Sequence, residues 1–262
     1  MGRSAEDARV EGYSALRGKD TIMRIHFIVH EAFEAPGAYE QWAVQRGHDV
    51  TYSRVYQGEP LPRAEDVDWL IIMGGPQSPT TTTDECPHFD SRAEQVIIRQ
   101  AIAADKCVIG VCLGAQLMGQ ALGGECERSP HKEIGSFPIW LTKEGESDPV
   151  AAAMFDDVSG QELTVGHWHG DMPGLTHDAV VLAMSEGCPR QIIRFAPRAY
   201  ALQCHPELTA EVVRLLVDAS TEELRQGCDE PFVDAPEDLL SAEYSEMNAA
   251  LFRFLDALVA HR

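Results

Sequence analysis

The chain has 262 residues, of which 44% are hydrophobic and 24% are charged, an ordinary balance for a globular protein of one large α/β domain or two small ones. Its 42 Asp and Glu residues outnumber 21 Lys and Arg, and the net charge of -21 argues against nucleic acid or an anionic membrane as a partner. The seven cysteines form no Cys-x-x-Cys pair, and no apolar stretch approaches a membrane span in length. We therefore expect a cytoplasmic protein.

The first hundred residues predict a parallel sheet. After a polar N-terminal extension (residues 1–21, with a short helix over 5–16), the pattern predicts a strand at 22–29, a helix at 38–46 and a strand at 49–54. This strand–helix–strand order is typical of a βαβ unit.

A third apolar strand, residues 68–73, runs into a Gly74-Gly75-Pro76 turn. Such a turn can aim backbone N–H groups at a neighbouring site, and this edge of an open α/β sheet is where ligands bind. An ordinary turn is the alternative. A polar loop at 80–87 and a helix at 89–104 follow.

The next stretch carries the strongest chemical signal. An apolar strand at 108–111 ends in Gly110-Val111-Cys112-Leu113-Gly114, and a helix begins at once, which is the layout of a nucleophile elbow. Glycines are expected there because strand and helix backbones crowd together. The helix dipole should lower the pKa of the Cys112 thiol. Gln116, one helical turn later, can reach the same pocket. A buried cysteine at a strand end is the alternative.

Weaker patterns predict an extended segment at 134–142, a helix at 148–155 and a strand at 163–165. A loop over 166–171, Gly-His-Trp-His-Gly-Asp, then places three ring side chains between two glycines. We expect it to form a wall or support of the active site. A merely structural loop stays open, and the His-x-His pair could bind a metal, although no other ligand cluster lies at suitable spacing.

Three strands are predicted next, at residues 179–183, 191–195 and 199–204. They are followed by a helix at 208–225, an acidic linker at 227–236 and a terminal helix at 236–261. We divide the chain into the extension at 1–21, a domain at 22–226, and a C-terminal part at 227–262 that packs on the domain.

The last predicted strand ends in His205-Pro206-Glu207. Pro206 favours an extended backbone at His205, so the side chains of His205 and Glu207 should lie on one face, near the sheet edge that carries Cys112. A thiol needs a base, and the base needs a group that fixes its tautomer. Cys112, His205 and Glu207 supply these three groups. Cys204 should point away from them and pack in the core.

Four stretches together resemble the class I glutamine amidotransferase family: residues 73–76 (Met-Gly-Gly-Pro), 110–116 (Gly-Val-Cys-Leu-Gly-Ala-Gln), 168–171 (Trp-His-Gly-Asp) and 203–207 (Gln-Cys-His-Pro-Glu). The resemblance spans roughly residues 22–208. It implies a flavodoxin-like α/β fold, with a doubly wound, mostly parallel sheet, flanking helices and a small antiparallel addition. It also implies hydrolysis of the glutamine side-chain amide, with no cofactor and no metal.

The resemblance also assigns roles. Cys112 attacks the amide, His205 is the general base and acid, and Glu207 orients His205. Gly74, Gly75 and Leu113 form the oxyanion hole. The contacts to the amino-acid end of the substrate come from Gln116, His167 and Trp168.

Three functional readings remain open at this stage. The chain could be an amidotransferase subunit that serves a separate synthetase, a free-standing hydrolase of glutamine or another γ-glutamyl compound, or a non-catalytic regulatory relative. Chaperone and protease-like proteins of related fold lack a His-x-Glu at a later strand end, so His205 and Glu207 count against them. A homodimer is an open expectation.

Overall fold

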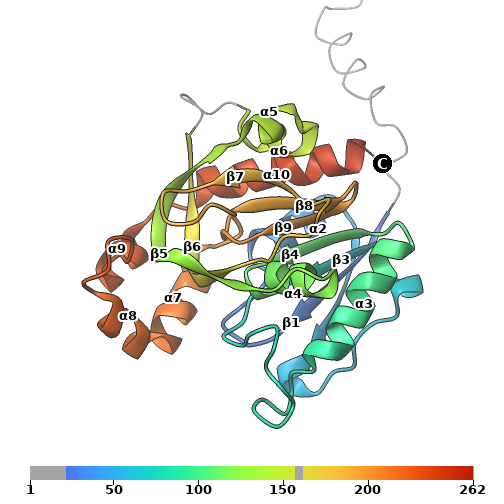
Figure 1. Ribbon diagram of the computed structural model, residues 1–262, viewed down its shortest axis with the longest axis horizontal. Helices are drawn as coiled ribbons and strands as arrows, with labels where there is room; N and C mark the ends of the chain where they lie inside the picture. Colours follow the sequence, from blue (N-terminus) through green and yellow to red (C-terminus); the bar gives the residue numbers. More distant parts are fainter. Residues whose placement is uncertain (1–21, 157–161, 262) are drawn as a thin grey trace, which may run out of the picture.

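A computed structural model describes residues 22–156 and 162–261 (Figure 1). The N-terminal extension, with its predicted helix, lies outside these ranges. Within them, nine strands form one sheet in the order β2-β1-β3-β4-β9-β8-β7-β5-β6. The predicted doubly wound α/β fold is confirmed, and the sheet divides into a parallel half and an antiparallel half.

The parallel half contains β1 (Arg24–Val29), β2 (Asp49–Arg54), β3 (Trp69–Ile72), β4 (Cys107–Val111) and β9 (Ala199–Leu202). The strands β1, β3, β4 and β9 are almost wholly buried, as expected where helices cover both faces of a parallel sheet. Because β4 and β9 are parallel neighbours, the residues that follow them meet at the same sheet edge.

The antiparallel half contains β5 (Glu127–Leu141), β6 (Glu162–Met172), β7 (Val180–Met184) and β8 (Ile192–Ala196). With four of the nine strands, this addition is larger than the small one that we predicted. The long β5–β6 ribbon brings Glu133 opposite His169.

Helices cover both faces of the sheet (Figure 1). On one face lie α3 (Ser91–Ala103) and α4 (Leu113–Ala121), and on the other lie α2 (Ala38–Gln45), α6 (Pro149–Met154) and α10 (Ser245–Ala260). Each group packs on its own hydrophobic core. Side-chain caps fix some helix starts, since Asp90 accepts a hydrogen bond from the backbone N–H of Ala93 and Asp148 from those of Val150 and Ala151.

The remaining helices are short. Two 3₁₀ helices, Val55–Gln57 and Ala64–Asp66, precede β3, and α5 (Lys143–Ser147) precedes α6. After β9 come α7 (Ala210–Ala219), α8 (Thr221–Gly227) and α9 (Pro236–Ser241), which lie together beside the β5–β6 side of the sheet (Figure 1). Across the described residues, none of the helices has the length and hydrophobicity that a bilayer span requires.

Several predicted boundaries were wrong. The predicted loop at 166–171 is the second half of β6, because its backbone pairs with β5. The predicted helix at 208–225 is two helices, since Ser220 leaves the helical conformation with φ -113° and ψ 21°. The predicted terminal helix is likewise split into α9 and α10 by an extended Ala242, and the predicted helix at 148–155 begins one residue later, behind the separate α5.

Candidate active site

Cys112 stands on a strained turn between β4 and α4. Its backbone has φ 50° and ψ -106°, a conformation that side-chain-bearing residues rarely adopt and that often marks functional sites. Glycine is required on both sides of it. A Cβ on Gly110 would lie 2.4 Å from the carbonyl oxygen of Gly114, and a Cβ on Gly114 would lie 2.1 Å from that of Ile72. The turn is therefore a nucleophile elbow in geometry as well as in sequence.

His205 and Glu207 follow β9 and meet Cys112 at this edge. The Nδ1 atom of His205 lies 2.8 Å from Oε1 of Glu207, and both side chains are buried. The backbone holds the neighbouring segments together, since the N–H of Cys112 donates to the carbonyl of Leu202 at 2.9 Å. The structure thus brings together a thiol, an imidazole and a carboxylate in the order that thiol activation needs.

The electrostatics of this group favour a protonated imidazole. Burial by itself lowers the pKa of His205, but the Glu207 carboxylate and the Cys112 thiol raise it, and the net result lies well above the ordinary value for histidine. Within the described residues, Nε2 of His205 is buried and makes no hydrogen bond of ordinary geometry. That nitrogen is therefore available to exchange a proton with a reacting group.

The strand β6 contacts both the nucleophile and the base. The N–H of His205 donates to the carbonyl of Gly166 at 2.7 Å, and Sγ of Cys112 lies 3.6 Å from the carbonyl oxygen of Trp168. The position of β6 therefore determines where both groups stand.

Two contacts from distant segments hold the His-Pro-Glu stretch. The carbonyl of Glu207 accepts a hydrogen bond from the N–H of Ala38 at 2.9 Å, beside Gly37, whose φ is 54°. In α10, the side-chain amide of Asn248 donates to the carbonyls of Pro206 at 2.8 Å and Leu208 at 3.0 Å. Nothing in the sequence indicates this role of Asn248, because it lies about forty residues after the carbonyls to which it donates.

A cavity of about 310 Å³ opens above Cys112. Its walls include the sequence-predicted residues Gly75, Gln116 and Trp168. The amide of Gln116 donates to Oε1 of Gln203 at 3.1 Å, so its orientation is fixed. Charged side chains from four separate segments also line the cavity. The residues concerned are Glu34, Arg128, Lys132, Asp171 and Glu223.

The predicted oxyanion-hole residues are close together but differ in their surroundings. Gly75 lines the cavity, and a Cβ on it would lie 2.9 Å from Cδ2 of Leu113. The carbonyl of Gly74 is turned to His30, whose Nδ1 lies 2.8 Å away. The Gly74 carbonyl is thus engaged by His30 and does not enter the cavity wall.

His167 is placed beneath the cavity and does not line it. Its ring is fully buried, with Nε2 3.2 Å from the carbonyl of Phe137 and Nδ1 3.5 Å from Glu133. Glu133 also lies 3.2 Å from Nε2 of His169 and accepts a hydrogen bond from Gln191 at 2.7 Å. Burial lowers the pKa of His167 to about 3, so this imidazole is neutral.

Sequence inspection missed Glu133, which joins His167 and His169 in a cluster whose potential ligand atoms lie within 4.8 Å of one another. By ligand type the three could hold a metal ion. The two imidazoles lie 3.5 Å and 3.2 Å from one oxygen of Glu133, and Ser185 donates to its other carboxylate oxygen at 2.7 Å. Cys204, as expected, packs in the core, where burial raises its pKa well above the ordinary value.

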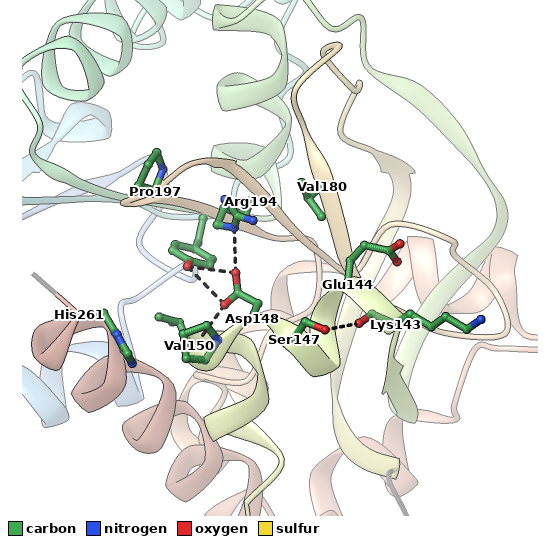
Figure 2. Close-up of a pocket in the computed structure, with 11 residues that line it drawn as sticks. Lys143, Glu144, Ser147, Asp148, Val150, Val180, Arg194, Pro197 and His261 are labelled. Carbon is green, nitrogen blue, oxygen red and sulfur yellow. Dashed lines mark hydrogen bonds and ion pairs between the residues drawn. The ribbon is translucent and has the colours of Figure 1, made fainter.

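A larger cavity, of about 670 Å³, lies elsewhere (Figure 2). It is lined by Pro197 and Tyr200, at the start of β9, so it lies at the opposite end of that strand from His205. At its centre, the carboxylate of Asp148 accepts hydrogen bonds from the backbone N–H of Val150, as a helix cap, and from Nε of Arg194 at 2.8 Å (Figure 2). We assign this cavity a structural role.

The family model for glutamine amidotransferase class I matches residues 38–214. The chain belongs to the class I glutamine amidotransferase family. The matched segment contains the elbow and the His-Pro-Glu stretch, so the family assignment and the geometry rest on the same residues.

The chain is 52% identical, over 91% of its length and 99% of the relative's, to the glutamine amidotransferase-like protein YfeJ of Salmonella typhimurium. The crystal structure of SMU.1228c has 51% identity and a TM-score of 0.86, covering 90% of this chain and all of that one. A third relative is the glutamine-hydrolysing GMP synthase of Tolumonas auensis, 31% identical over 67% of this chain. Here the match spans only 30% of the relative.

Proposed function

We propose that this member of the class I glutamine amidotransferase family is a cysteine hydrolase that cleaves the side-chain amide of glutamine and releases ammonia and glutamate. The observation that carries the proposal is the convergence of Cys112, His205 and Glu207 at one sheet edge, beneath a cavity that Gln116 also lines. The glutamine-hydrolysing relatives support the choice of substrate.

In the proposed reaction, the thiol proton of Cys112 already resides on His205 in the resting site, and Glu207 stabilises this imidazolium. The Cys112 thiolate attacks the γ-carboxamide carbon, and the developing oxyanion receives hydrogen bonds from backbone N–H groups of the Gly74-Gly75 turn and Leu113. Collapse of the tetrahedral intermediate breaks the C–N bond, and the nitrogen leaves with a proton from His205. Water, deprotonated by His205, then hydrolyses the γ-glutamyl thioester.

On the substrate side, we assign Gln116 and Trp168 to the amino-acid end of glutamine. His167 precedes Trp168 in β6, and its contacts with Glu133 and Phe137 hold this part of the strand in place. No cofactor or metal enters the scheme.

The test is release of ammonia and glutamate from glutamine by the purified chain, compared with Cys112→Ala. We expect activity in the wild type and a loss of at least about a thousandfold in the variant. A diazoketone analogue of glutamine, added in parallel, should label Cys112 covalently, as read by peptide mass spectrometry. Absence of both hydrolysis and labelling would favour a non-catalytic relative, and full activity of Cys112→Ala would refute the assignment of the nucleophile.

A second candidate is a free-standing hydrolase of another γ-glutamyl compound. It is favoured by two cationic side chains in the cavity wall, Arg128, which pairs with Asp171 at 3.2 Å, and Lys132, which pairs with Glu223 at 2.7 Å. An additional acidic group on a larger substrate would take the place of one of these carboxylates. A panel of γ-glutamyl amides with acidic or neutral leaving groups tests this, because the candidate requires a preference for the acidic ones that Lys132→Ala abolishes.

We further propose a cytoplasmic protein in which cysteines such as Cys112 and Cys204 persist as free thiols. If a separate synthetase takes up the ammonia, that subunit should co-purify with the chain. Size-exclusion chromatography tests the expected homodimer.

A further inference from the structure

One carboxylate in the cavity has no role in the reaction described above. Glu34 follows β1, is only 8% exposed, and lines the same cavity as Cys112 and Gln116. Within residues 22–156 and 162–261, its side chain makes no hydrogen bond or ion pair that the structure records. A buried carboxylate without a donor is costly, so a ligand that brings N–H groups is the natural complement of this one.

The neighbouring acidic residues, unlike Glu34, have partners among the described residues. Glu31 lies 3.0 Å from Nε2 of His88 and accepts a hydrogen bond from Gln77. Glu94 lies 2.9 Å from Nε2 of His30. Among the carboxylates around the Gly-Gly turn, only Glu34 both reaches the cavity and is unpaired in the described parts of the chain.

The position of Glu34 indicates which part of a substrate it would meet. A Cβ on Gly74 would lie 2.5 Å from Oε2 of Glu34, so the carboxylate rests directly on the turn beside the expected oxyanion site. Burial raises the pKa of Glu34 to about 7, and His205 is the charged group that opposes this most strongly. Glu34 thus lies within electrostatic reach of His205, the residue that protonates the leaving nitrogen in the proposed reaction.

We propose that Glu34 forms the leaving-group site: its carboxylate accepts hydrogen bonds from the N–H groups of the scissile amide and of the departing ammonia. The inference rests on the proposed amide hydrolysis. Glu34 transfers no proton. As the C–N bond breaks, its electron pair goes to nitrogen, the proton comes from His205, and Glu34 holds the nitrogen in line with that transfer. The substrate class is therefore γ-glutamyl compounds whose leaving atom is an N–H-bearing nitrogen.

The experiment compares two substrates that differ only in the leaving group, L-glutamine and the γ-methyl ester of L-glutamate. Both give the same thioester, and kcat/KM reports the steps up to its formation. For Glu34→Ala we expect kcat/KM on glutamine to fall about 10- to 100-fold, the range for a hydrogen bond to a charged group, and kcat/KM on the ester to stay within about twofold. Glu34→Gln should retain part of the preference through its amide oxygen.

A matched control is Glu40→Gln, in α2 and outside the cavity, which should leave both substrates unaffected. Equal losses on both substrates in Glu34→Ala would overturn the proposal, because they would place the carboxylate at the shared amino-acid end. No loss on either substrate would overturn it too. If the wild type cleaves neither substrate, the proposed hydrolysis falls as well, which separates that failure from failure of the leaving-group site alone.

Discussion

Replacing Glu34 by glutamine should stabilise the folded protein in a pH-dependent way. Burial raises the pKa of Glu34 from 4.5 to about 7. Between these values the folded state keeps a proton that the unfolded state has lost, so the wild type loses stability as pH rises from 4.5 to 7. By linkage, this amounts to about 3 kcal/mol at about pH 8. Glu34→Gln does not ionise and escapes that loss.

The assay is urea unfolding of wild type and Glu34→Gln, followed by tryptophan fluorescence, from about pH 4 to about pH 8. The free-energy difference between the two proteins should grow in favour of the variant up to about pH 7 and then level off. Any cost of burying the amide is the same at every pH, so the slope is diagnostic. A difference that does not change with pH would refute the reasoning. The Glu40→Gln variant serves as the reference.

Four further results are expected. Glu207→Gln should lower kcat about 10²- to 10⁴-fold with little change in KM, and an unchanged kcat would remove Glu207 from the mechanism. Gly37→Ala should lower the free energy of unfolding, measured in thermal or urea unfolding, by more than about 2 kcal/mol, because its Cβ would lie 2.3 Å from the carbonyl oxygen of Glu207. Gly58→Ala, where φ is also positive but no atom lies within 4 Å of the added Cβ, should lower it by about 1 kcal/mol. Equal costs would show that the contact is unimportant. Glu133→Gln should reduce kcat roughly 10- to 100-fold by loosening β6, measured by steady-state kinetics, and full activity would contradict that coupling. Incubation with EDTA should leave glutamine hydrolysis unchanged, and a loss that Zn²⁺ restores would instead make Glu133 a metal ligand.

The parts of the site that follow from local pattern were predictable. An apolar strand followed by Gly-x-Cys-x-Gly specifies the turn at Cys112, because only glycine fits beside it. Strand ends in a parallel sheet share one edge, so the meeting of Cys112 with His205 follows from topology. The existence of a parallel half could be deduced in a similar way, from short apolar runs separated by helices, whereas the order of its strands comes from the structure.

The parts that depend on tertiary packing were not predictable. Glu34, Glu133 and Asn248 look like ordinary surface residues in the sequence, and their roles arise from contacts with segments far along the chain. The break at Ser220 also had no clear signal, since the amphipathic pattern continues through it. The apparent loop at 166–171 became a strand because pairing with β5 outweighed its local glycine content.

The hydrogen bonds from Asn248 to the His-Pro-Glu segment have a consequence for the order in which the site forms. Helix α10 is the last element to be synthesised among the described residues, yet it donates to both backbone carbonyls that flank Glu207. A chain still on the ribosome, with α10 inside the exit tunnel, lacks this clamp and holds His205 and Glu207 loosely. The His205–Glu207 pair therefore reaches its final geometry only after α10 has been synthesised and has packed against this segment.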